Sequence, residues 1–165
     1  MAKLEVFYDY SCPFCLKGHQ YLAELISHYP DMEIAWCPCE AHPRPEEYGR
    51  HSDLTMQGMY VALEAGADIW AYHDAMYRAG VTDRAAIEDI AVLAGYVEGI
   101  LDRDAFVAAL EQGTYREIQQ KGNDYAYGEN GVWAVPSYRM EGRKLDSPEG
   151  VGITLEQLRD FLDGK

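Results

Sequence analysis

The sequence has no apolar stretch that approaches the ~20 residues a membrane-spanning helix requires, so no such helix is expected. It is also poor in basic residues. Its 14 Lys and Arg stand against 28 Asp and Glu, which gives a formal net charge of −14. This balance argues against nucleic acids and anionic membranes as partners. The chain contains no internal repeat, and its 165 residues, 48% of them hydrophobic, suffice for one domain with its own core.

The chain leaves no room for a secretory signal peptide, because it begins Met-Ala-Lys and turns to β-forming residues at once. We therefore expect a cytoplasmic protein. Cysteines are few, at four. In a reducing compartment such thiols are more often catalytic or metal-binding than structural.

The motif Cys12-Pro13-Phe14-Cys15 lies between an expected strand, residues 4–8, and an amphipathic helix that ends before Pro30. Cys12 then occupies the helix N-cap, and Pro13 the first helical position, where a missing N–H costs nothing. Free N–H groups and the helix dipole at this end favour a thiolate. They lower the pKa of Cys12 and make it the attacking sulfur. Cys15 lies one turn further along the same helix face, close enough to form a disulfide with Cys12.

A C-x-x-C motif has three interpretations: a redox dithiol, half of a zinc site, or two ordinary buried thiols. The strand–motif–helix context and the proline inside the motif favour the redox dithiol, because structural zinc pairs usually lie on knuckle turns. A zinc site would also require a second ligand pair in a similar turn, and none follows in the sequence. We expect no metal centre and no cofactor.

A second strand is predicted over residues 32–36 and leads into Cys37-Pro38-Cys39. A strand–helix–strand unit crosses over right-handed and pairs its strands in parallel. The carboxyl ends of both strands then point the same way, so Cys37 and Cys39 should lie at the same end of the sheet as Cys12. Three interpretations of this pair stay open: buried or half-buried thiols, an auxiliary redox pair, or metal ligands shared with the first motif.

The middle of the chain is predicted to be entirely helical. A loop over residues 40–53 contains Pro43 and Pro45 and precedes five amphipathic runs within about residues 52–128. The third run is predicted to be capped by Thr82-Asp83 and the fourth by Asp102 or Asp104, while the fifth covers about residues 114–127.

Strand character returns after the helical segment. Strands are predicted over residues 132–140 and, after a turn at Glu141-Gly142-Arg143, at Lys144-Leu145. Thr154 is predicted to cap a final helix. The order βαβ, helical insertion, ββα predicts an α/β protein with a thioredoxin fold. Its core comprises residues 1–40 and 130–165, in a single domain of residues 1–165.

Three segments carry a resemblance to a known family: FYDYSCPFCLKG (residues 7–18), WCPCEAHP (residues 36–43) and GVWAVPSY (residues 131–138). With them, the chain resembles the DsbA family of thioredoxin-fold proteins, in particular its cytosolic FrnE-type branch. The resemblance implies a cis peptide bond between Val135 and Pro136, packed beside the dithiol. It also implies that Pro13, Phe14, Val135 and Pro136 contact the substrate. Alternatively, Pro136 only begins an edge strand, where its missing N–H is harmless.

The chain departs from that family at three places. Phe14 replaces the His of strongly oxidising members, so a less extreme redox potential is expected. Val6 replaces a buried acid beneath the second cysteine, which leaves Asp9 or water to handle the Cys15 proton. Asp9 can instead simply cap the turn. The third departure is Cys37 and Cys39, at positions where relatives tend to carry Arg and Phe.

Five histidines are present, and none has a spacing that indicates a metal centre. His19 lies one turn beyond Cys15, and we expect a solvated helix residue there. The 13 tyrosines and three tryptophans either line a groove above Cys12 or pack in the core and on the surface.

These observations predict a thiol-disulfide oxidoreductase in which Cys12 attacks and Cys15 resolves a mixed disulfide. Its partners would be protein thiols and disulfides or a small thiol reductant, and the protein would be a monomer or homodimer. Two alternatives remain: a glutathione-dependent isomerase or transferase of the related kappa-class type, and a non-enzymatic, redox-controlled metal-binding module. Retention of Cys15 argues against the former, since those relatives generally need only the first thiol.

Overall fold

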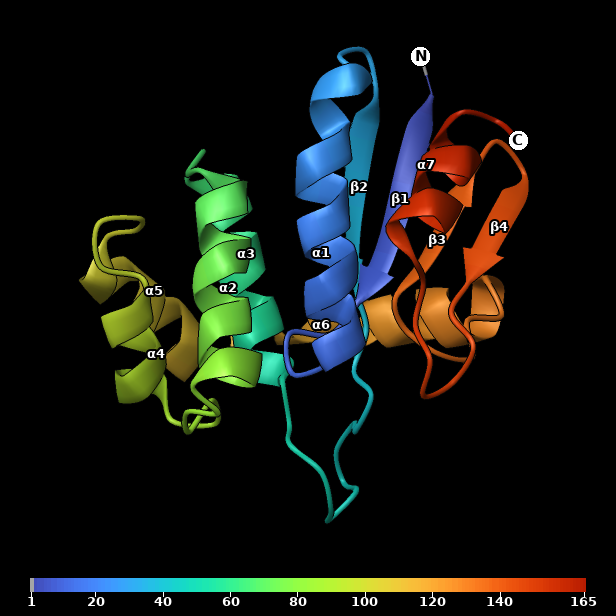
Figure 1. Cartoon of the computed structure of the whole chain (residues 1–165). Helices are drawn as coiled ribbons and strands as arrows, with labels where there is room; N and C mark the ends of the chain where they lie inside the picture. Colours follow the sequence, from blue (N-terminus) through green and yellow to red (C-terminus); the bar gives the residue numbers. More distant parts are fainter. Residues whose placement is uncertain (1) are drawn as a thin grey trace.

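A computed structural model describes residues 2–165, and within them four strands form one mixed sheet in the order β2-β1-β3-β4 (Figure 1). The strands are β1 (Lys3–Tyr8), β2 (Glu33–Pro38), β3 (Ser137–Met140) and β4 (Arg143–Asp146). β1 pairs in parallel with β2 and antiparallel with β3, and β3 pairs antiparallel with β4. The predicted parallel pairing of the first two strands is confirmed.

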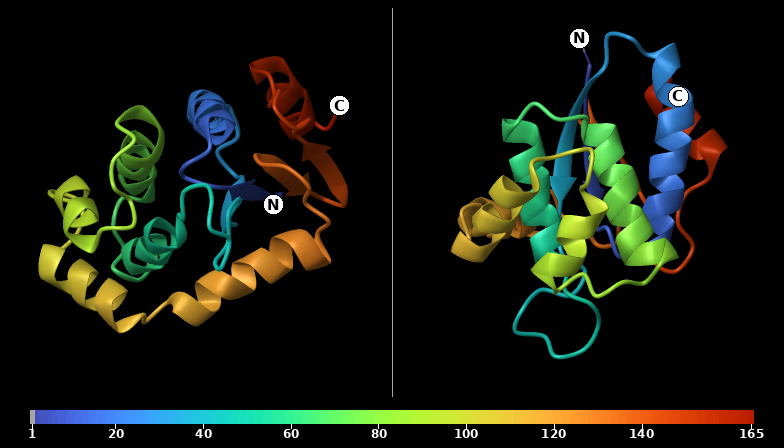
Figure 2. Two further views of the ribbon diagram at one scale, coloured as in Figure 1. Left: turned by 90° about the horizontal axis from the view of Figure 1, so that it is seen from below. Right: turned by 90° about the vertical axis from the view of Figure 1, so that its left-hand side faces the viewer.

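Helices cover both faces of the sheet (Figure 2). One face carries α1 (Pro13–Leu25), which continues into a 3-10 turn, η1 (Ile26–His28), and α7 (Leu155–Leu162). The other face carries α6 (Arg116–Asn123) and the π-helical turn η3 (Asp124–Glu129). Side chains of β1 alternate accordingly, since Leu4, Val6 and Tyr8 pack with α1 while Phe7 packs with Ala126 of η3.

The remaining helices lie beside the sheet at its β2 edge (Figures 1 and 2). They are α2 (Asp53–Glu64), α3 (Ile69–Tyr77), the π-helical turn η2 (Arg78–Thr82), α4 (Ile90–Tyr96) and α5 (Arg103–Gln112). The element order therefore confirms the predicted fold, a thioredoxin-like α/β core with a helical segment between β2 and β3. None of the helices within residues 2–165 is long and apolar enough to cross a membrane.

Most α-helices begin at a residue whose side chain caps the first backbone N–H groups of the helix. The Asp102 side chain accepts a bond from the Ala105 N–H at the start of α5, and Thr154 forms a capping box with Gln157 at the start of α7. The predicted cap at Thr82-Asp83 is wrong. Arg84 adopts a left-handed conformation (φ 48°), which interrupts a helix there. Helix α4 begins only at Ile90, and Asp89 caps it.

The strand predicted from residue 132 is also wrong in its first half, because β3 begins only at Ser137. Val132 donates its backbone N–H to Ala126 of η3 rather than to a neighbouring strand. Pro136 has no N–H to donate. Residues 132–136 therefore form an irregular segment that reaches across the end of the sheet.

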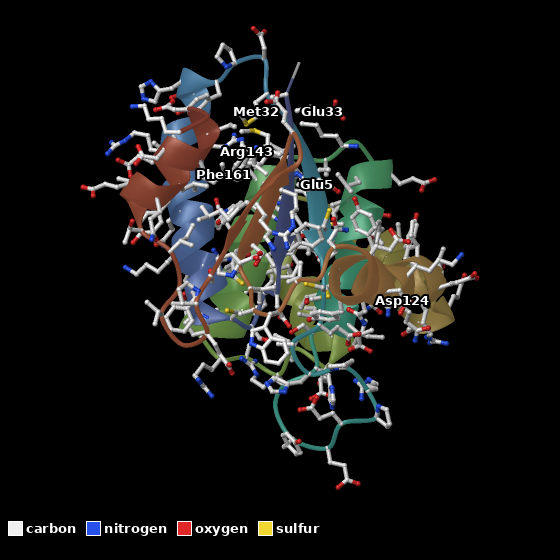
Figure 3. The ribbon with its side chains drawn as sticks, turned by 90° about the vertical axis from the view of Figure 1, so that its right-hand side faces the viewer. Glu5, Met32, Glu33, Asp124, Arg143 and Phe161 are labelled. Carbon is white, nitrogen blue, oxygen red and sulfur yellow. The ribbon has the colours of Figure 1, made fainter. Side chains whose placement is uncertain are left out.

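The C-terminal helix buries Leu158, Phe161 and Leu162 in the core, and an arginine links it to the edge strand of the sheet. The guanidinium of Arg143 on β4 lies 4.6 Å from the ring centroid of Phe161 on α7 and donates to the Phe161 carbonyl at 2.8 Å (Figure 3). This combination of a cation–π contact and a hydrogen bond orients α7 against β4.

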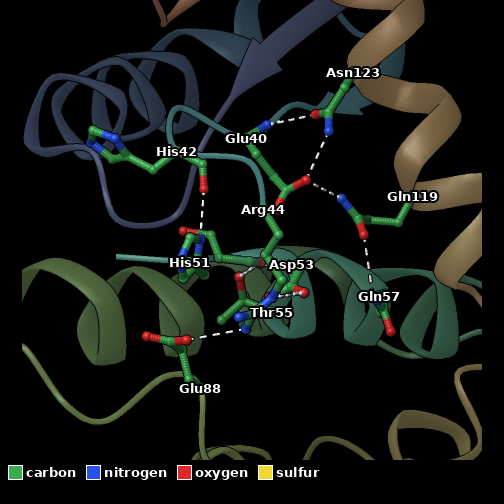
Figure 4. Close-up of polar contacts among 11 residues, drawn as sticks. Glu40, His42, Arg44, His51, Asp53, Thr55, Gln57, Glu88, Gln119 and Asn123 are labelled. Atoms are coloured by element: carbon green, nitrogen blue, oxygen red, sulfur yellow. Dashed lines mark hydrogen bonds and ion pairs between the residues drawn. The ribbon is translucent and has the colours of Figure 1, made fainter. Parts of the chain in front are cut away.

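The loop after β2, residues 39–52, is bound to the helices at several points (Figure 4). Arg44 pairs with Asp53 of α2 and with Glu88. The buried Glu40 carboxylate accepts bonds from Gln119 and Asn123 of α6, at 3.0 and 2.7 Å. These contacts tie the loop that follows β2 to α2 and α6.

Candidate active site

The turn between β1 and α1 places Cys12 at the N-cap of α1, as predicted, with Pro13 in its first turn. The Cys12 N–H donates to the Asp9 carbonyl at 3.1 Å, and the Cys12 carbonyl accepts from the N–H groups of Cys15 and Leu16, both at 3.1 Å. The Cys12 sulfur is half-buried and lies 3.8 Å from the Val135 carbonyl oxygen.

The two thiols of the motif have opposite electrostatic environments. A hydrogen bond from the Cys15 thiol, together with the backbone N–H groups of Cys15 and Phe14, lowers the pKa of Cys12, although burial and the charge of Asp9 oppose this. Burial is the main cause that raises the pKa of Cys15 well above its ordinary value. Cys15 is only 1% exposed, and its sulfur accepts the Asp9 N–H at 3.5 Å. The pair thus combines an acidic, accessible thiol with a buried thiol that retains its proton.

Asp9 is fully buried and its carboxylate fixes the turn. One carboxylate oxygen accepts the N–H and O–H of Ser11, both at 2.9 Å, and the other accepts the Ala41 N–H at 2.8 Å. The residue therefore caps the turn before Cys12 and ties it to the loop after β2.

The other residues expected to contact substrate surround Cys12. Pro13 and Phe14 are exposed, Val135 is half-buried and Pro136 is buried. The peptide bond between Val135 and Pro136 is cis. The Pro136 ring faces Gly18 of α1, one turn inside Cys15, so the irregular segment before β3 packs directly against the motif helix.

A surface pocket of about 390 Å³ lies next to this segment. It is lined by Glu40–Pro43 on one side, by Tyr127 of η3, and by Trp133–Val135 on the other side. Trp133 is 83% exposed, which is unusual for a tryptophan and leaves an aromatic face at the rim of the pocket.

Cys37 and Cys39 lie at the same end of the sheet as Cys12 but on the other face. Phe7 of β1 pairs in register with Cys37, and Cys39 packs with Phe7, Ala126 and Val132. Burial is the main cause that raises the pKa of Cys37 to about 12, and it also raises the pKa of Cys39. Both are therefore protonated thiols near neutral pH. All four cysteines are free among the described residues.

One expectation near the motif is wrong. His19 is buried rather than solvated, because its ring packs on Trp70 and Tyr77 of α3 and its Nε2 lies 2.8 Å from an oxygen of Asp74. Burial lowers its pKa. Helix α3 also brings His73 next to the motif. The sequence signal for the positions of His19 and His73 was only the aromatic character of residues 69–77, which does not say which part of the protein α3 covers.

Within residues 2–165, no group of three or more His, Cys, Asp or Glu side chains is arranged to hold a metal ion. Cys15 belongs to the core on the α1 side of the sheet and Cys39 to the cluster on the η3 side. The sheet thus separates the two buried sulfurs.

Comparisons with known proteins find relatives that match nearly the whole chain. A Bacillus subtilis (strain 168) protein described as uncharacterised, YwbO, is 27% identical, and the match covers 95% of this chain and 96% of the relative. A candidate protein disulfide isomerase from Nitrosomonas europaea superposes with a TM-score of 0.78 at 14% identity, covering 99% and 96% of the two chains. Chlamydia trachomatis DsbA gives a TM-score of 0.72 at 17% identity, covering 99% and 87%.

At these identities the two solved structures establish a shared fold. The model of the DSBA-like thioredoxin domain family matches residues 3–163, nearly the whole sequence. The chain therefore belongs to the DSBA-like thioredoxin domain family.

Proposed function

We propose that the protein is a thiol-disulfide oxidoreductase that uses Cys12 as the attacking thiol and Cys15 as the resolving thiol. The observation that supports this most strongly is the difference between the two sulfurs. Cys12 has a lowered pKa and partial exposure, whereas Cys15 is buried with a raised pKa. A thiolate is the nucleophile in disulfide exchange, so the two cysteines have different roles.

In the reductive direction, the Cys12 thiolate attacks a substrate disulfide, forms a mixed disulfide and releases the first substrate thiolate. Cys15 then loses its proton and attacks the Cys12 sulfur. The second substrate thiolate leaves and a Cys12–Cys15 disulfide remains. The substrate gains two electrons and the protein loses two. The same steps in reverse oxidise a substrate dithiol, and the environment of the thiols is compatible with both directions.

The substrate would lie across Val135 and the adjacent pocket. The Val135 carbonyl faces Cys12, and the segment Trp133–Val135 presents backbone groups and an exposed aromatic ring at the pocket rim. An extended peptide fits such a surface through main-chain hydrogen bonds and apolar contacts. Pro13 and Phe14 would contact the same substrate from the α1 side. We therefore propose protein thiols and disulfides as substrates, with a small thiol as reductant, for a cytoplasmic protein that acts as a monomer or homodimer.

The test is insulin reduction with dithiothreitol, using the wild-type chain and single Cys→Ser variants. Cys12→Ser should lose turnover by at least about a thousandfold, because the nucleophile is gone. Cys15→Ser should accumulate mixed disulfides that non-reducing gels and mass spectrometry detect. The matched control is Cys37→Ser, which should retain wild-type turnover. Substantial activity in Cys12→Ser, or its loss in Cys37→Ser, would place the chemistry at the second pair.

A further inference from the structure

Behind Cys15 lies a small enclosed cavity that the proposed reaction does not yet use. Its volume is about 10 Å³, at the lower limit for one water molecule. Its lining includes Cys15 from α1, His73 and Tyr77 from α3, and Tyr138 from β3. Helices α1 and α3 lie side by side at this place (Figure 2). The buried thiol and the buried imidazole therefore line the same space.

The hydrogen bonds around His73 determine which of its ring nitrogens carries the proton. Tyr8 donates its O–H to the Met59 sulfur at 2.8 Å, since a thioether can only accept. The Tyr8 oxygen must then accept from Tyr10, 3.2 Å away. The Tyr10 hydrogen is thereby used, so its oxygen accepts from His73 Nδ1 at 2.8 Å.

His73 is consequently the tautomer with hydrogen on Nδ1 and a lone pair on Nε2. Among the described residues, Nε2 is a buried nitrogen with no hydrogen-bond partner, and the residue is 1% exposed. A buried acceptor without a donor is costly, and such groups usually bond an ordered water. The cavity that His73 shares with Cys15 offers the space for that water.

The groups that contact His73 are aromatic rings, one of them the imidazole of His19. Tyr8 and Tyr10 contact it from β1 and the turn, Trp36 from β2, and His19 from α1. Trp70 packs on it from its own helix. The carboxylate of Asp74, the next residue along α3, lies 2.8 Å from His19 Nε2. Burial and His19 lower the pKa of His73, so the ring is neutral near pH 7 and its lone pair is free.

We propose that His73, through one water in this cavity, accepts the proton of Cys15 when Cys15 resolves the mixed disulfide. This inference rests on the proposed function and assigns it a residue that neither the motif nor the family match identifies. Val6 lines the same cavity at the position where a buried acid would otherwise lie, so the β1 side offers no base.

The resolving step forms one S–S bond, breaks another and moves one proton. As the Cys15 sulfur bonds to the Cys12 sulfur, its proton passes to the water while a proton of that water passes to His73 Nε2. The bond between Cys12 and the substrate sulfur breaks, and the substrate leaves as a thiolate. Nδ1–H continues to donate to Tyr10, which stabilises the imidazolium. Because proton transfer accompanies S–S bond formation, no free Cys15 thiolate accumulates. The proton then returns to solvent or to the leaving thiolate.

Asp9 is the competing acceptor. Its backbone N–H contacts the Cys15 sulfur, but its carboxylate oxygens accept from Ser11 and Ala41. Those bonds hold the carboxylate toward the loop after β2. The two acceptors make different predictions for single-residue variants.

The experiment is stopped-flow reduction of dithiobis(nitrobenzoate) by a small excess of the reduced protein. The first release of nitrothiobenzoate reports attack by Cys12, and the second reports resolution by Cys15. The variant His73→Asn retains an amide that can donate to Tyr10 but lacks Nε2. We expect its first phase to stay within about twofold and its second phase to slow at least about tenfold. A second variant, His73→Gln, provides a polar group that cannot take a proton and should slow the second phase similarly.

The pH profile separates proton transfer from structural damage. In the wild-type protein the second phase should be nearly independent of pH between 7 and 8.5. In His73→Asn it should rise by about tenfold per pH unit, because only ionisation by solvent remains. The structural control is Tyr72→Phe on the same helix as His73, which removes a buried hydroxyl that donates to the Thr55 carbonyl of α2. It should leave both phases unchanged.

The inference would be overturned if His73→Asn left the second phase unchanged or slowed both phases equally. It would also be overturned if the second phase were lost only in Asp9→Asn. Absence of a first phase in the wild-type protein would instead contradict the proposed function itself.

A measurement on the unmodified chain avoids variants that fold poorly. Nitrogen-15 NMR of the reduced protein should show the His73 ring protonated on Nδ1. A ring protonated on Nε2 would contradict the inference.

Discussion

The two cysteine pairs occupy equivalent places in the chain and different places in the molecule. The first pair follows β1 and the second spans the end of β2, and both lie at the carboxyl end of the parallel β1–β2 unit. Cys12 and Cys15 continue into a helix, so that Cys12 receives hydrogen bonds from Cys15 and from backbone N–H groups. Cys37 and Cys39 remain in extended chain against Phe7 and η3.

Two thiols that are close in sequence therefore do not acquire the same electrostatic environment at the two places. The pKa is lowered only at Cys12, where the hydrogen bonds to its sulfur outweigh burial, whereas at the other three thiols burial is the largest effect and raises the pKa. The second difference is what lies behind each pair. Cys15 is backed by a cavity with two histidines, while Cys39 is backed by apolar side chains.

The largest effect is expected from glycines that border the two pairs. A Cβ at Gly18 would lie 2.5 Å from the Tyr138 hydroxyl and 3.2 Å from the Pro136 ring. We expect Gly18→Ala to lower the free energy of unfolding by about 1–3 kcal/mol and to reduce turnover, because the segment beside Cys12 must move. Denaturant titration and the insulin assay measure the two effects.

Two other glycines serve as controls for that variant. Gly122→Ala would place its Cβ 2.9 Å from the Pro38 carbonyl, between the second pair of cysteines, and should reduce stability without slowing turnover. Gly95→Ala meets no atom of residues 2–165 within 4 Å and should gain about 0.5–1 kcal/mol. If Gly122→Ala impaired exchange as strongly as Gly18→Ala, the distinction between the pairs would fail.

The buried histidines predict a pH dependence of stability. The folded-state pKa values of His19 and His73 lie below the ordinary value of 6.5. Below pH 6.5 the unfolded chain therefore binds protons that the folded chain does not. The free energy of unfolding should fall with decreasing pH, by at most about 1.4 kcal/mol per pH unit for each histidine. Chemical denaturation between pH 7 and 5 should show this slope, and His73→Asn should reduce it. An unchanged slope in that variant would place His73 outside the core.

Asp9→Asn tests how the turn before Cys12 contributes to the difference between the two pairs. The amide would direct N–H groups at the Ala41 N–H, so we expect a loss of about 1–2 kcal/mol in stability. Loss of the Asp9 charge, which raises the pKa of Cys12, should also make Cys12 more reactive at pH 6. Alkylation rates measure this change. A slower Cys12 would show that Asp9 supports the thiolate rather than opposing it.

The smallest effect should come from the second pair. Cys39→Ala removes a fully buried sulfur and should cost about 1 kcal/mol, whereas Cys37→Ala, at a half-buried position, should cost no more than about 0.5 kcal/mol. Neither change should alter exchange kinetics. A kinetic defect in either variant would favour the auxiliary redox interpretation of this pair.

The sequence predicted β1, α1 and α7 well, because the signals that define them are local. These signals are the alternation of apolar and polar residues in β1, Pro13 at the start of α1 and Thr154 at the start of α7, and each acts within a few residues. The start of α4 was predicted wrongly. Asp83 and Asp89 offer the same side chain, but the left-handed backbone at Arg84 interrupts a helix that begins at Asp83, and Asp89 caps α4 instead.

The environment of the thiols could not be predicted to the same degree. His19 looked like a surface residue because its partners, Trp70 and Asp74, belong to a helix whose docking the sequence does not specify. The cover over Cys39 comes from η3 and Val132, far along the chain. The sequence therefore identified the candidate reactive residues, but not the surroundings that set their pKa values.

The most direct test of this account is competitive alkylation of the four thiols in the reduced native protein. Iodoacetamide at pH 7, followed by time-resolved peptide mass spectrometry, gives a rate for each cysteine. The account predicts that Cys12 reacts first and at least about ten times faster than Cys15, Cys37 or Cys39, because it alone has a lowered pKa. Modification of Cys37 at the same rate as Cys12 would contradict it.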